Sequence, residues 1–567
     1  MAEHDSGAGK PTPALTGFTR RAFVGAGVLG GASLLTGGFD ALLHASAAAA
    51  DIPNGELLGL SIAQLQLLMV RGEVSSVELT RAYLERIRQL NPLLGAVIET
   101  NRNAVATAAL LDTQRRNGQL RGPLHGIPIL LKDNIATSDE MHTTAGSLAL
   151  LGNRVPRDAN VAAKLRQGGA VFLGKANLSE WANFRGFAPF NGWSARGGFT
   201  RNPYLLSDDP SGSSSGSAVA VSASMCAAAI GTETDGSIVS PSGQCHIVGL
   251  KPTLGLLAQR GIIPIAHTQD TAGPMGRSVT DVALLLGAMQ SQTGAGTGVS
   301  SNYIPYLQRG SLRGKRIGID TRYFTPSFGG EPDIVATAKK ALSVMKNLGA
   351  TLVETDTGDP DVYFNDEFTA LLFEFKVDIA AYLAELRNTS MRTLADLIAF
   401  NAANCPEEMR FYGQELFEIA ESTSGDLNDP EYVLARTSSV QLARSGIDNA
   451  MTRDNLHAVV APSYTYASSV AAVSGYPNLS LPIGLTSLGR PGGIWMYGRR
   501  LSEPSLLAFA YDLEQELGPQ KRPTFAGVVP PLPLDAGICS APTIRSRMSR
   551  GRITMPYHIG TGKPFNR

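Results

Sequence analysis

The stretch from Ser211 to Ser237, SGSSSGSAVAVSASMCAAAIGTETDGS, constrains what this chain can fold into more than any other part of it. Most of its side chains are Ser, Gly or Ala, which let neighbouring backbones approach closely, and it begins and ends in tight Gly-containing turns. Taken alone, such a Ser/Gly loop is usually a flexible connection, and a loop that cradles phosphate would be followed by a GK[ST] sequence, which is missing here. The apolar centre of the stretch predicts a tightly packed helix over residues 218–229.

A lysine upstream gives this stretch a chemical interpretation. Lys132 ends an apolar run, GIPILLK, which predicts a buried strand over residues 126–131. A serine hydroxyl is a weak nucleophile unless a base takes its proton, and a lysine is such a base only where burial leaves it neutral. We therefore interpret Ser237 as a nucleophile, Ser213 as a proton relay and Lys132 as the base. Because a salt bridge to Asp133 would raise the lysine pKa, we expect the Asp133 side chain to point away.

The turn that ends the stretch is suited to form an oxyanion hole. Its successive backbone N–H groups can point at one spot, where they would stabilise the charge that develops on an attacked carbonyl oxygen. The residues predicted to contribute are Thr234, Asp235, Gly236 and Ser237. Asp235 also brings a carboxylate near the site, which suggests a substrate with a cationic or N–H-donating group.

Several motifs match those of a known family. They are GTETDGSI at 231–238, SEWANF at 179–184, GWSARGG at 192–198 and LLFEFK at 371–376. With them the chain resembles the amidase signature family along nearly its whole length, and the peptide amidase branch of that family most of all. Asp235 departs from the usual family pattern, which has a second glycine at that position.

The resemblance implies a fold, a reaction and a site. The fold expected is α/β, with one large twisted mixed β-sheet covered by helices on both faces and a helical lobe over the cleft. The reaction expected is hydrolysis of primary carboxamides, such as the C-terminal amides of peptides, through an acyl-enzyme and without cofactor or metal. Lys132, Ser213 and Ser237 match the catalytic positions of the family, with a cis peptide bond between Gly212 and Ser213. Asn183 is a candidate for holding the substrate amide, and an ordinary buried asparagine is the alternative.

Other functions remain as alternatives. They are a broad amidase acting on aryl, acyl or oligomeric amides, the A subunit of the tRNA-dependent glutamine amidotransferase, and an inactive binding protein on the same scaffold. A histidine-based triad is disfavoured because His125, His142 and His246 have no GxSxG elbow to serve, and no HExxH or similar cluster of metal ligands occurs. The 49 acidic and 49 basic residues balance, which disfavours an electrostatic nucleic-acid binder. The sequence does not specify an oligomeric state.

The two ends of the chain differ from the part between them. Residues 1–50 carry a twin-arginine pattern, TRRAFV, before a short Gly/Ala-diluted apolar segment. This pattern predicts export by the twin-arginine machinery to the periplasm or beyond, without stable membrane insertion. Residues 51–520 are expected to form one amidase signature catalytic domain, and residues 521–567 a basic, mobile tail. The four cysteines show no metal or redox spacing, so we predict no structural disulfide, while one involving Cys405 or Cys539 after export stays open.

Apolar periodicity places the remaining elements. Helices are predicted over residues 61–72, 75–91, 160–168, 333–347 and 501–517, with a mostly helical region over 361–439. Strands are predicted over residues 170–174, 316–320, 459–462, 479–484 and 493–496. The Asn91-Pro92 pair is expected to end the second helix.

Overall fold

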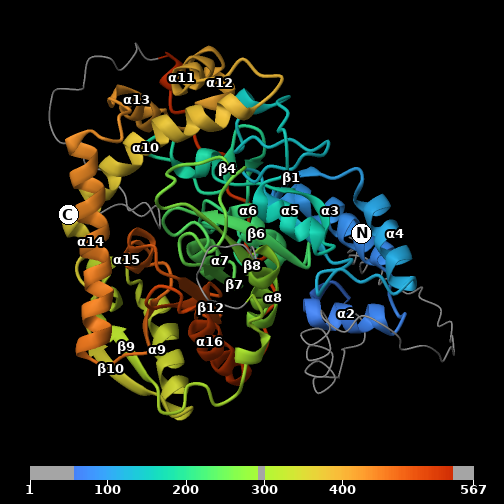
Figure 1. Cartoon of the computed structure of the whole chain (residues 1–567), viewed down its shortest axis with the longest axis vertical. Helices are drawn as coiled ribbons and strands as arrows, with labels where there is room; N and C mark the ends of the chain where they lie inside the picture. Colours follow the sequence, from blue (N-terminus) through green and yellow to red (C-terminus); the bar gives the residue numbers. More distant parts are fainter. Residues whose placement is uncertain (1–56, 291–300, 541–567) are drawn as a thin grey trace, which may run out of the picture.

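The structure is a computed structural model that describes residues 57–290 and 301–540 (Figure 1). One mixed sheet passes through the middle of these residues, in the strand order β1-β3-β2-β6-β8-β7-β12-β13-β11-β9-β10. Its strands are β1 (Val97–Thr100), β2 (Pro128–Lys132), β3 (Val171–Ala176), β6 (Ala228–Glu233), β7 (Val248–Lys251), β8 (Thr271–Gly276), β9 (Arg316–Asp320), β10 (Thr351–Thr355), β11 (Ala458–Pro462), β12 (Asn478–Leu485) and β13 (Pro491–Tyr497). A small hairpin of β4 (Trp193–Ser194) and β5 (Gly198–Phe199) stands apart from it.

Helices connect and cover these strands. They are α2 (Ile62–Val70), α3 (Ser76–Leu94), α4 (Ala104–Arg116), α5 (Asn160–Gln167), α6 (Ser215–Ser222), α7 (Val239–Gln244), α8 (Val279–Met289), α9 (Pro332–Asn347), α10 (Phe364–Glu385), α11 (Leu394–Ala403), α12 (Cys405–Glu408), α13 (Glu415–Ser422), α14 (Pro430–Arg453), α15 (Ala467–Ser474) and α16 (Glu503–Leu517). β2 runs parallel to both β3 and β6, and β9 runs parallel to β10 and β11. Parallel neighbours need a crossover, which α5 supplies between β2 and β3 and α9 between β9 and β10. The expected α/β fold with one large mixed sheet is confirmed.

Both faces of the sheet are covered, as alternation along β13 shows. Ile494 and Met496 belong to the main core, to which α8, α9 and α16 contribute. Trp495 and Tyr497 belong to a second cluster that includes residues of α7, α14 and α15. Successive side chains of a strand point to opposite faces, so one set of helices packs on each face.

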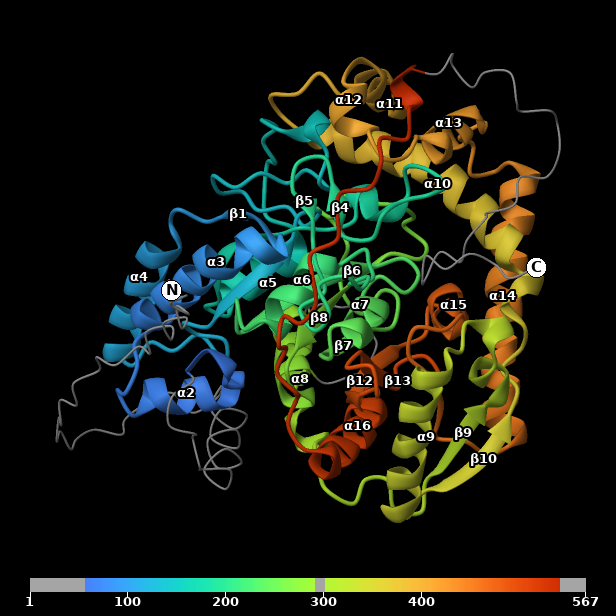
Figure 2. The same cartoon turned by 180° about the vertical axis from the view of Figure 1, so that it is seen from behind.

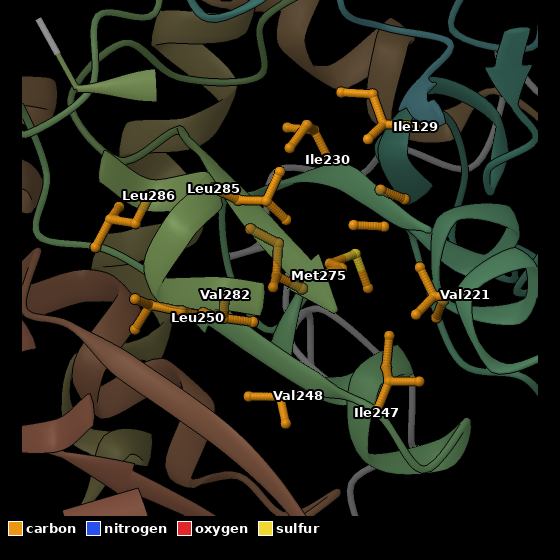
Figure 3. Close-up of a cluster of buried hydrophobic side chains, with 14 of the residues drawn as sticks. Ile129, Val221, Ile230, Ile247, Val248, Leu250, Met275, Val282, Leu285 and Leu286 are labelled. Carbon is orange, nitrogen blue, oxygen red and sulfur yellow. The ribbon is translucent and has the colours of Figure 1, made fainter. Parts of the chain in front are cut away.

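The strands next to the site are fixed by apolar packing. Figure 3 shows part of the main core, in which Ile129 of β2, Ile230 of β6 and Met275 of β8 cluster with Leu285 and Leu286 of α8. Full burial of each such side chain contributes roughly 1.5–3 kcal/mol relative to exposure. This core holds the register between β2 and β6, in which Leu130 pairs with Ala229 and Leu131 with Ile230.

A helical lobe of α10 to α14 lies over one end of the sheet (Figures 1 and 2). Its core is rich in aromatic rings, and two of them receive residues of the 179–184 segment. Trp181 contacts Phe417 edge-on with ring centroids 5.5 Å apart, and Phe184 contacts Phe375 at 5.3 Å. The predicted helical region is thereby confirmed, and its packing joins the lobe to a segment that precedes the serine loop.

The last described residues form a strap, residues 521–540, which Figure 2 shows in red running from α16 up to the lobe. Leu206 N donates to Ala526 O at 2.9 Å, and Ala536 N donates to Arg410 O at 2.9 Å, so this part of the expected tail is bound to the rest of the chain. A disulfide between Cys405 and Cys539 closes the strap onto α12. The prediction of no structural disulfide is therefore wrong, because the fold brings together two cysteines 134 residues apart in sequence, which spacing patterns do not reveal.

Two boundaries differ from the sequence prediction. α3 continues through Pro92 to Leu94 and ends at Gly95, which has φ +57°. The Asn91 side chain exchanges two hydrogen bonds of 2.8 Å with the Val97 backbone, which secures this end of the helix. The helix predicted over 218–229 ends at Ser222, and residues 228–233 form β6 instead. Alanines have little preference that resists pairing with β2, so the sheet decides their conformation.

The predicted leader, residues 1–50, and residues 541–567 of the predicted tail lie outside the described residues. Within the described ranges, no helix combines the length and the apolar character needed to cross a membrane.

Candidate active site

Lys132 lies at the carboxyl end of β2, between β3 and β6. Every residue of β2 is buried, and Lys132 itself has an exposed fraction of 0%. Its side-chain nitrogen is surrounded by hydroxyl and carbonyl oxygens. Nζ donates to Ser213 Oγ at 2.7 Å, to Thr232 Oγ1 at 2.9 Å and to Thr232 O at 3.2 Å. Thr232 was not foreseen from the sequence, although its place on β6 next to the lysine strand follows from the sheet.

Burial prepares this lysine to act as a base. Desolvation lowers the pKa of Lys132 to about 7, against a smaller opposing effect from the charges of Asp270 and Glu233. A substantial fraction of the lysine is therefore neutral near pH 7, as proton abstraction requires.

Asp133 points away from the lysine, as expected. Its carboxylate accepts hydrogen bonds from the Thr144 hydroxyl, from Thr144 N at 3.2 Å and from Gly146 N at 3.3 Å. Arg196 Nη1 contacts both of its oxygens at 3.3 Å. The carboxylate adjacent in sequence is thus neutralised elsewhere and leaves Lys132 to its hydroxyl partners.

The serine loop brings the two candidate serines together. The peptide bond between Gly212 and Ser213 is cis, as the resemblance implies, and Ser213 O accepts a hydrogen bond of 3.0 Å from Ser179 N. Ser214 N donates to Ser237 O at 3.1 Å, which ties the loop to the second turn. Gly216 permits this packing, since a Cβ there would lie 2.3 Å from the carbonyl oxygen of Ala96.

The second turn connects β6 to α7. Glu233 accepts hydrogen bonds from Ile238 N at 2.7 Å and from Val239 N at 3.0 Å, and so closes the turn from inside. Gly236 has φ +76°, a conformation that L side chains rarely adopt. Ser237 has an exposed fraction of 7%, so its side chain keeps some contact with solvent in an otherwise buried turn. The turn therefore carries an accessible hydroxyl on a fixed backbone.

Two acidic side chains surround this turn. Thr234 Oγ1 donates to Asp270 Oδ1 at 2.6 Å, and burial raises the pKa of Asp270 to about 7. Asp235 is 1% exposed, and its Oδ2 accepts a hydrogen bond from the Ser469 hydroxyl of α15. The carboxyl of Asp235 is thus directed to the protein interior, which differs from the expectation that it contacts substrate.

Asn183 lies in a backbone turn of unusual conformation. Trp181, Ala182 and Asn183 have φ values of +48°, +54° and +70°, three left-handed residues in succession. Such conformations cost on the order of 1–3 kcal/mol each and persist only where the surroundings enforce them. Asn183 Nδ2 donates to Asn191 Oδ1 at 2.9 Å, while its Oδ1 is buried without a partner. An acceptor atom therefore remains available on the predicted substrate-binding residue.

The histidines take no part in this arrangement. His125 Nε2 contacts Leu111 O at 2.9 Å, and His142 Nδ1 lies 3.1 Å from Glu99 Oε2. His246 is buried with its ring 5.8 Å from that of Tyr204. None of these three contacts a serine of the site.

One group of side chains in the described ranges has the composition to hold a metal ion: His267, Glu374 and Asp378. His267 Nδ1 lies 2.9 Å from Asp378 Oδ2 and 3.1 Å from Glu374 Oε2, and these carboxylates raise the pKa of the imidazole. The sequence did not suggest this group, because the histidine is far from the two acids of α10 along the chain. Its members form a hydrogen-bonded cluster without contact to Lys132, Ser213 or Ser237.

The family model described as Amidase matches residues 78–507. The chain belongs to the amidase family. A probable amidase of Arabidopsis thaliana is 42% identical over 476 residues, which cover 82% of this chain and 91% of the relative. The A-type chain of a glutamyl-tRNA(Gln) amidotransferase from Thermosynechococcus vestitus is 33% identical over 80% of this chain and 97% of the relative. A solved structure, the peptide amidase PAM in complex with the competitive inhibitor chymostatin, is 45% identical with a TM-score of 0.78 over 82% of this chain and 98% of that one.

These matches confirm the resemblance to the amidase signature family and to its peptide amidase branch. This amidase is accordingly a hydrolase that acts on amide bonds. The assignment of roles to Lys132, Ser213, Ser237 and Asn183 remains a prediction, and the geometry above supplies the grounds for it.

Proposed function

We propose that this amidase is an exported enzyme that hydrolyses primary carboxamides, in particular C-terminal amides of peptides, to the acid and ammonia. The observation that carries the proposal is the 2.7 Å hydrogen bond between Lys132 Nζ and Ser213 Oγ at a fully buried position. A lysine placed on a serine and away from carboxylates is arranged for proton transfer rather than for a salt bridge.

In the proposed reaction Ser237 Oγ attacks the carbonyl carbon of the amide. Its proton passes to Ser213, whose own proton passes to the neutral amine of Lys132. The oxyanion that forms is stabilised by backbone N–H groups of the turn 234–237. The carbon–nitrogen bond then breaks as the relay returns a proton to the leaving nitrogen, and ammonia departs from an acyl-enzyme on Ser237.

Water completes the cycle by the same route. The relay takes a proton from water as its oxygen attacks the acyl carbon, and it returns that proton to Ser237 Oγ as the ester bond breaks. Carboxylic acid leaves and the enzyme is regenerated. One lysine thus serves alternately as base and acid, and the step needs no other titrating group.

The substrate class rests on two supports. A solved relative at 45% identity is a peptide amidase. The free Oδ1 of Asn183 suits the N–H of a carboxamide or of the preceding peptide unit. The broad amidase and the inactive binding protein remain the alternatives.

An A-type chain of the tRNA-dependent amidotransferase is the other candidate with support, since one such chain is 33% identical. The twin-arginine pattern at residues 19–24 and the disulfide between Cys405 and Cys539 favour the exported amidase, because disulfides persist mainly in oxidising compartments.

The test is ammonia release from an amidated dipeptide by the purified chain, with Ser237→Ala as the matched control. We expect release by the parent protein and none above background by the variant. Release by both proteins would overturn the role of Ser237. Release from simple aryl or aliphatic amides but not from peptide amides would replace the peptide substrate with the broad one.

Export is tested separately. Replacing Arg20 and Arg21 together by Lys should retain the protein in the cytoplasm of a bacterium that has a twin-arginine pathway, whereas the parent reaches the periplasm. Equal distribution of both proteins would remove the export proposal and leave the amidase proposal intact.

A further inference from the structure

Two buried acids meet behind the turn that carries Ser237. Asp235 belongs to that turn and is 1% exposed, and Glu367 belongs to the first part of α10 and is 0% exposed. They are close enough that the charge of Asp235 raises the pKa of Glu367 well above its usual range, after the larger effect of burial. The pair joins the helical lobe to the site, and the mechanism proposed above does not use it.

Each acid has one oxygen bound and one oxygen without a partner. Asp235 Oδ2 accepts a hydrogen bond from the Ser469 hydroxyl, and Glu367 Oε1 accepts one of 2.7 Å from Gln269 Nε2. Asp235 Oδ1 and Glu367 Oε2 are both buried without a hydrogen-bond partner. Two buried carboxylates in such surroundings cannot both stay ionised, because each charge disfavours the other and burial disfavours both.

We propose that Asp235 and Glu367 share one proton, held between their two unpartnered oxygens, and that this acid pair is a positioning element for the turn that carries Ser237. The shared proton gives both free oxygens a hydrogen bond and leaves a single negative charge on the pair. Asp235 is thereby held against α10, so the backbone of residues 234–237 is fixed from behind.

A second connection runs through Gln269. Its Nε2 donates to Glu367 Oε1 and also to Thr234 O at 3.1 Å. Arg436 Nη1 of α14 donates to Gln269 Oε1 at 3.2 Å and fixes the orientation of the amide. Glu367 thus reaches the turn at two successive residues, Asp235 directly and Thr234 through Gln269.

Other groups face the pair from each surrounding element. Glu233 of β6 raises the pKa of Asp235, while the Ser468 hydroxyl of α15 and the charge of Lys251 of β7 lower it. Arg436 of α14 lowers the pKa of Glu367, and Tyr363, just before α10, contributes a buried hydroxyl. Neither Lys251 nor Arg436 forms a direct ion pair with the two acids, so hydroxyl and amide donors are the main stabilisers of the single remaining charge.

The pair predicts an alkaline limit to activity. Removing its proton at high pH leaves two buried like charges, which repel and displace the turn. This functional consequence rests on the proposed role of Ser237, whereas the shared proton itself is a property of the resting protein. The two are therefore tested by separate measurements.

Infrared spectroscopy tests the proton without any substrate. At neutral pH the wild-type spectrum should contain the carbonyl band of a protonated carboxylic acid that is absent from Glu367→Gln. Glu514→Gln is the matched control, because burial raises the pKa of Glu514 to about 8 and its carboxylate binds Val279 N, outside the site. The control should lose a band of its own and keep that of the pair. A Glu367→Gln spectrum without the loss of a carboxylic acid band would overturn the shared proton.

The pH dependence of kcat tests the positioning role. Glu367→Gln keeps a donor for Asp235 but cannot lose a proton, so its kcat near pH 7 should stay near that of the wild type while the alkaline decline disappears. Glu367→Ala has no donor and should lose roughly tenfold in kcat with little change in KM, because the turn is displaced rather than the binding surface. Wild-type kcat in Glu367→Ala, or an unchanged alkaline decline in Glu367→Gln, would overturn the positioning role even if the infrared band is found.

Discussion

Lys132 Nζ lies 2.7 Å from Ser213 Oγ, and its other two hydrogen bonds go to oxygens of Thr232 rather than to a carboxylate. The first prediction concerns pH. Only the neutral amine accepts a proton, and its fraction rises as pH increases through a pKa of about 7. On the acid side kcat/KM for an amidated dipeptide should therefore rise about tenfold per pH unit and level off above about pH 7. Initial rates across this range give the profile, and a rate independent of pH on the acid side would contradict a lysine base.

Asp270 provides the control for this pH profile. Its charge is the largest effect that raises the pKa of Lys132 against desolvation. Asp270→Asn keeps an acceptor for the Thr234 hydroxyl but removes the charge, so the acid limb should move to lower pH. A shift in the opposite direction would show that another group controls the limb.

A second prediction concerns stability. The pKa of Lys132 is about 7 in the folded protein and 10.5 in its ordinary state, so the unfolded chain binds its proton more tightly. The free energy of unfolding of the wild type therefore falls as pH decreases from 10.5 to about 7 and levels off below that value. Lys132→Met should abolish activity and be more stable at neutral pH by on the order of 3–5 kcal/mol, a difference that shrinks in alkaline solution. Denaturant titrations at neutral and alkaline pH measure both values; a difference that grows with pH would contradict the depressed pKa.

A third prediction concerns the disulfide. Cys405→Ser with Cys539→Ser should lower the free energy of unfolding by about 2–4 kcal/mol and make the strap sensitive to proteases, because the bond closes a long loop. A reductant should have the same effect on the wild type and none on the variant. Cys226 is a free buried cysteine, so Cys226→Ala is the control that should keep the response to reductant. Equal stability of oxidised and reduced wild type would show that the strap is held by its other contacts.

A fourth prediction concerns Arg185, which is fully buried beside the turn of Asn183. Its Nη1 lies 3.1 Å from Glu180 Oε1, and its guanidinium lies 4.0 Å from the centre of the Tyr412 ring in the lobe. Arg185→Met leaves a buried acid without its partner and should cost about 3–5 kcal/mol in unfolding free energy. Adding Glu180→Gln should recover much of that loss. If the double variant is no more stable than the single one, the aromatic contact carries the effect.

The parts of the fold that local apolar patterns specify were predictable from sequence. β2 follows from the run before Lys132, and the catalytic assignment of Ser213 and Ser237, which stays a prediction, rests on the Gly turns around them. The strand β6 was missed because its alanines suit a helix equally well, and only pairing with β2 decides between them. The disulfide, the left-handed turn at Asn183 and the pair of Asp235 with Glu367 all depend on contacts between distant segments, which a single sequence does not display.

The helical lobe has a consequence for how enzymes of this plan can diversify. It comes from one continuous stretch between β10 and β11, whereas Lys132, Ser213 and Ser237 all precede that stretch. Exchange of residues on the outward helices can therefore alter which acyl chains are admitted while the proton-transfer groups are inherited unchanged. Only a few positions, Glu367 foremost among them, tie the two modules together, and these set the limit to such recombination.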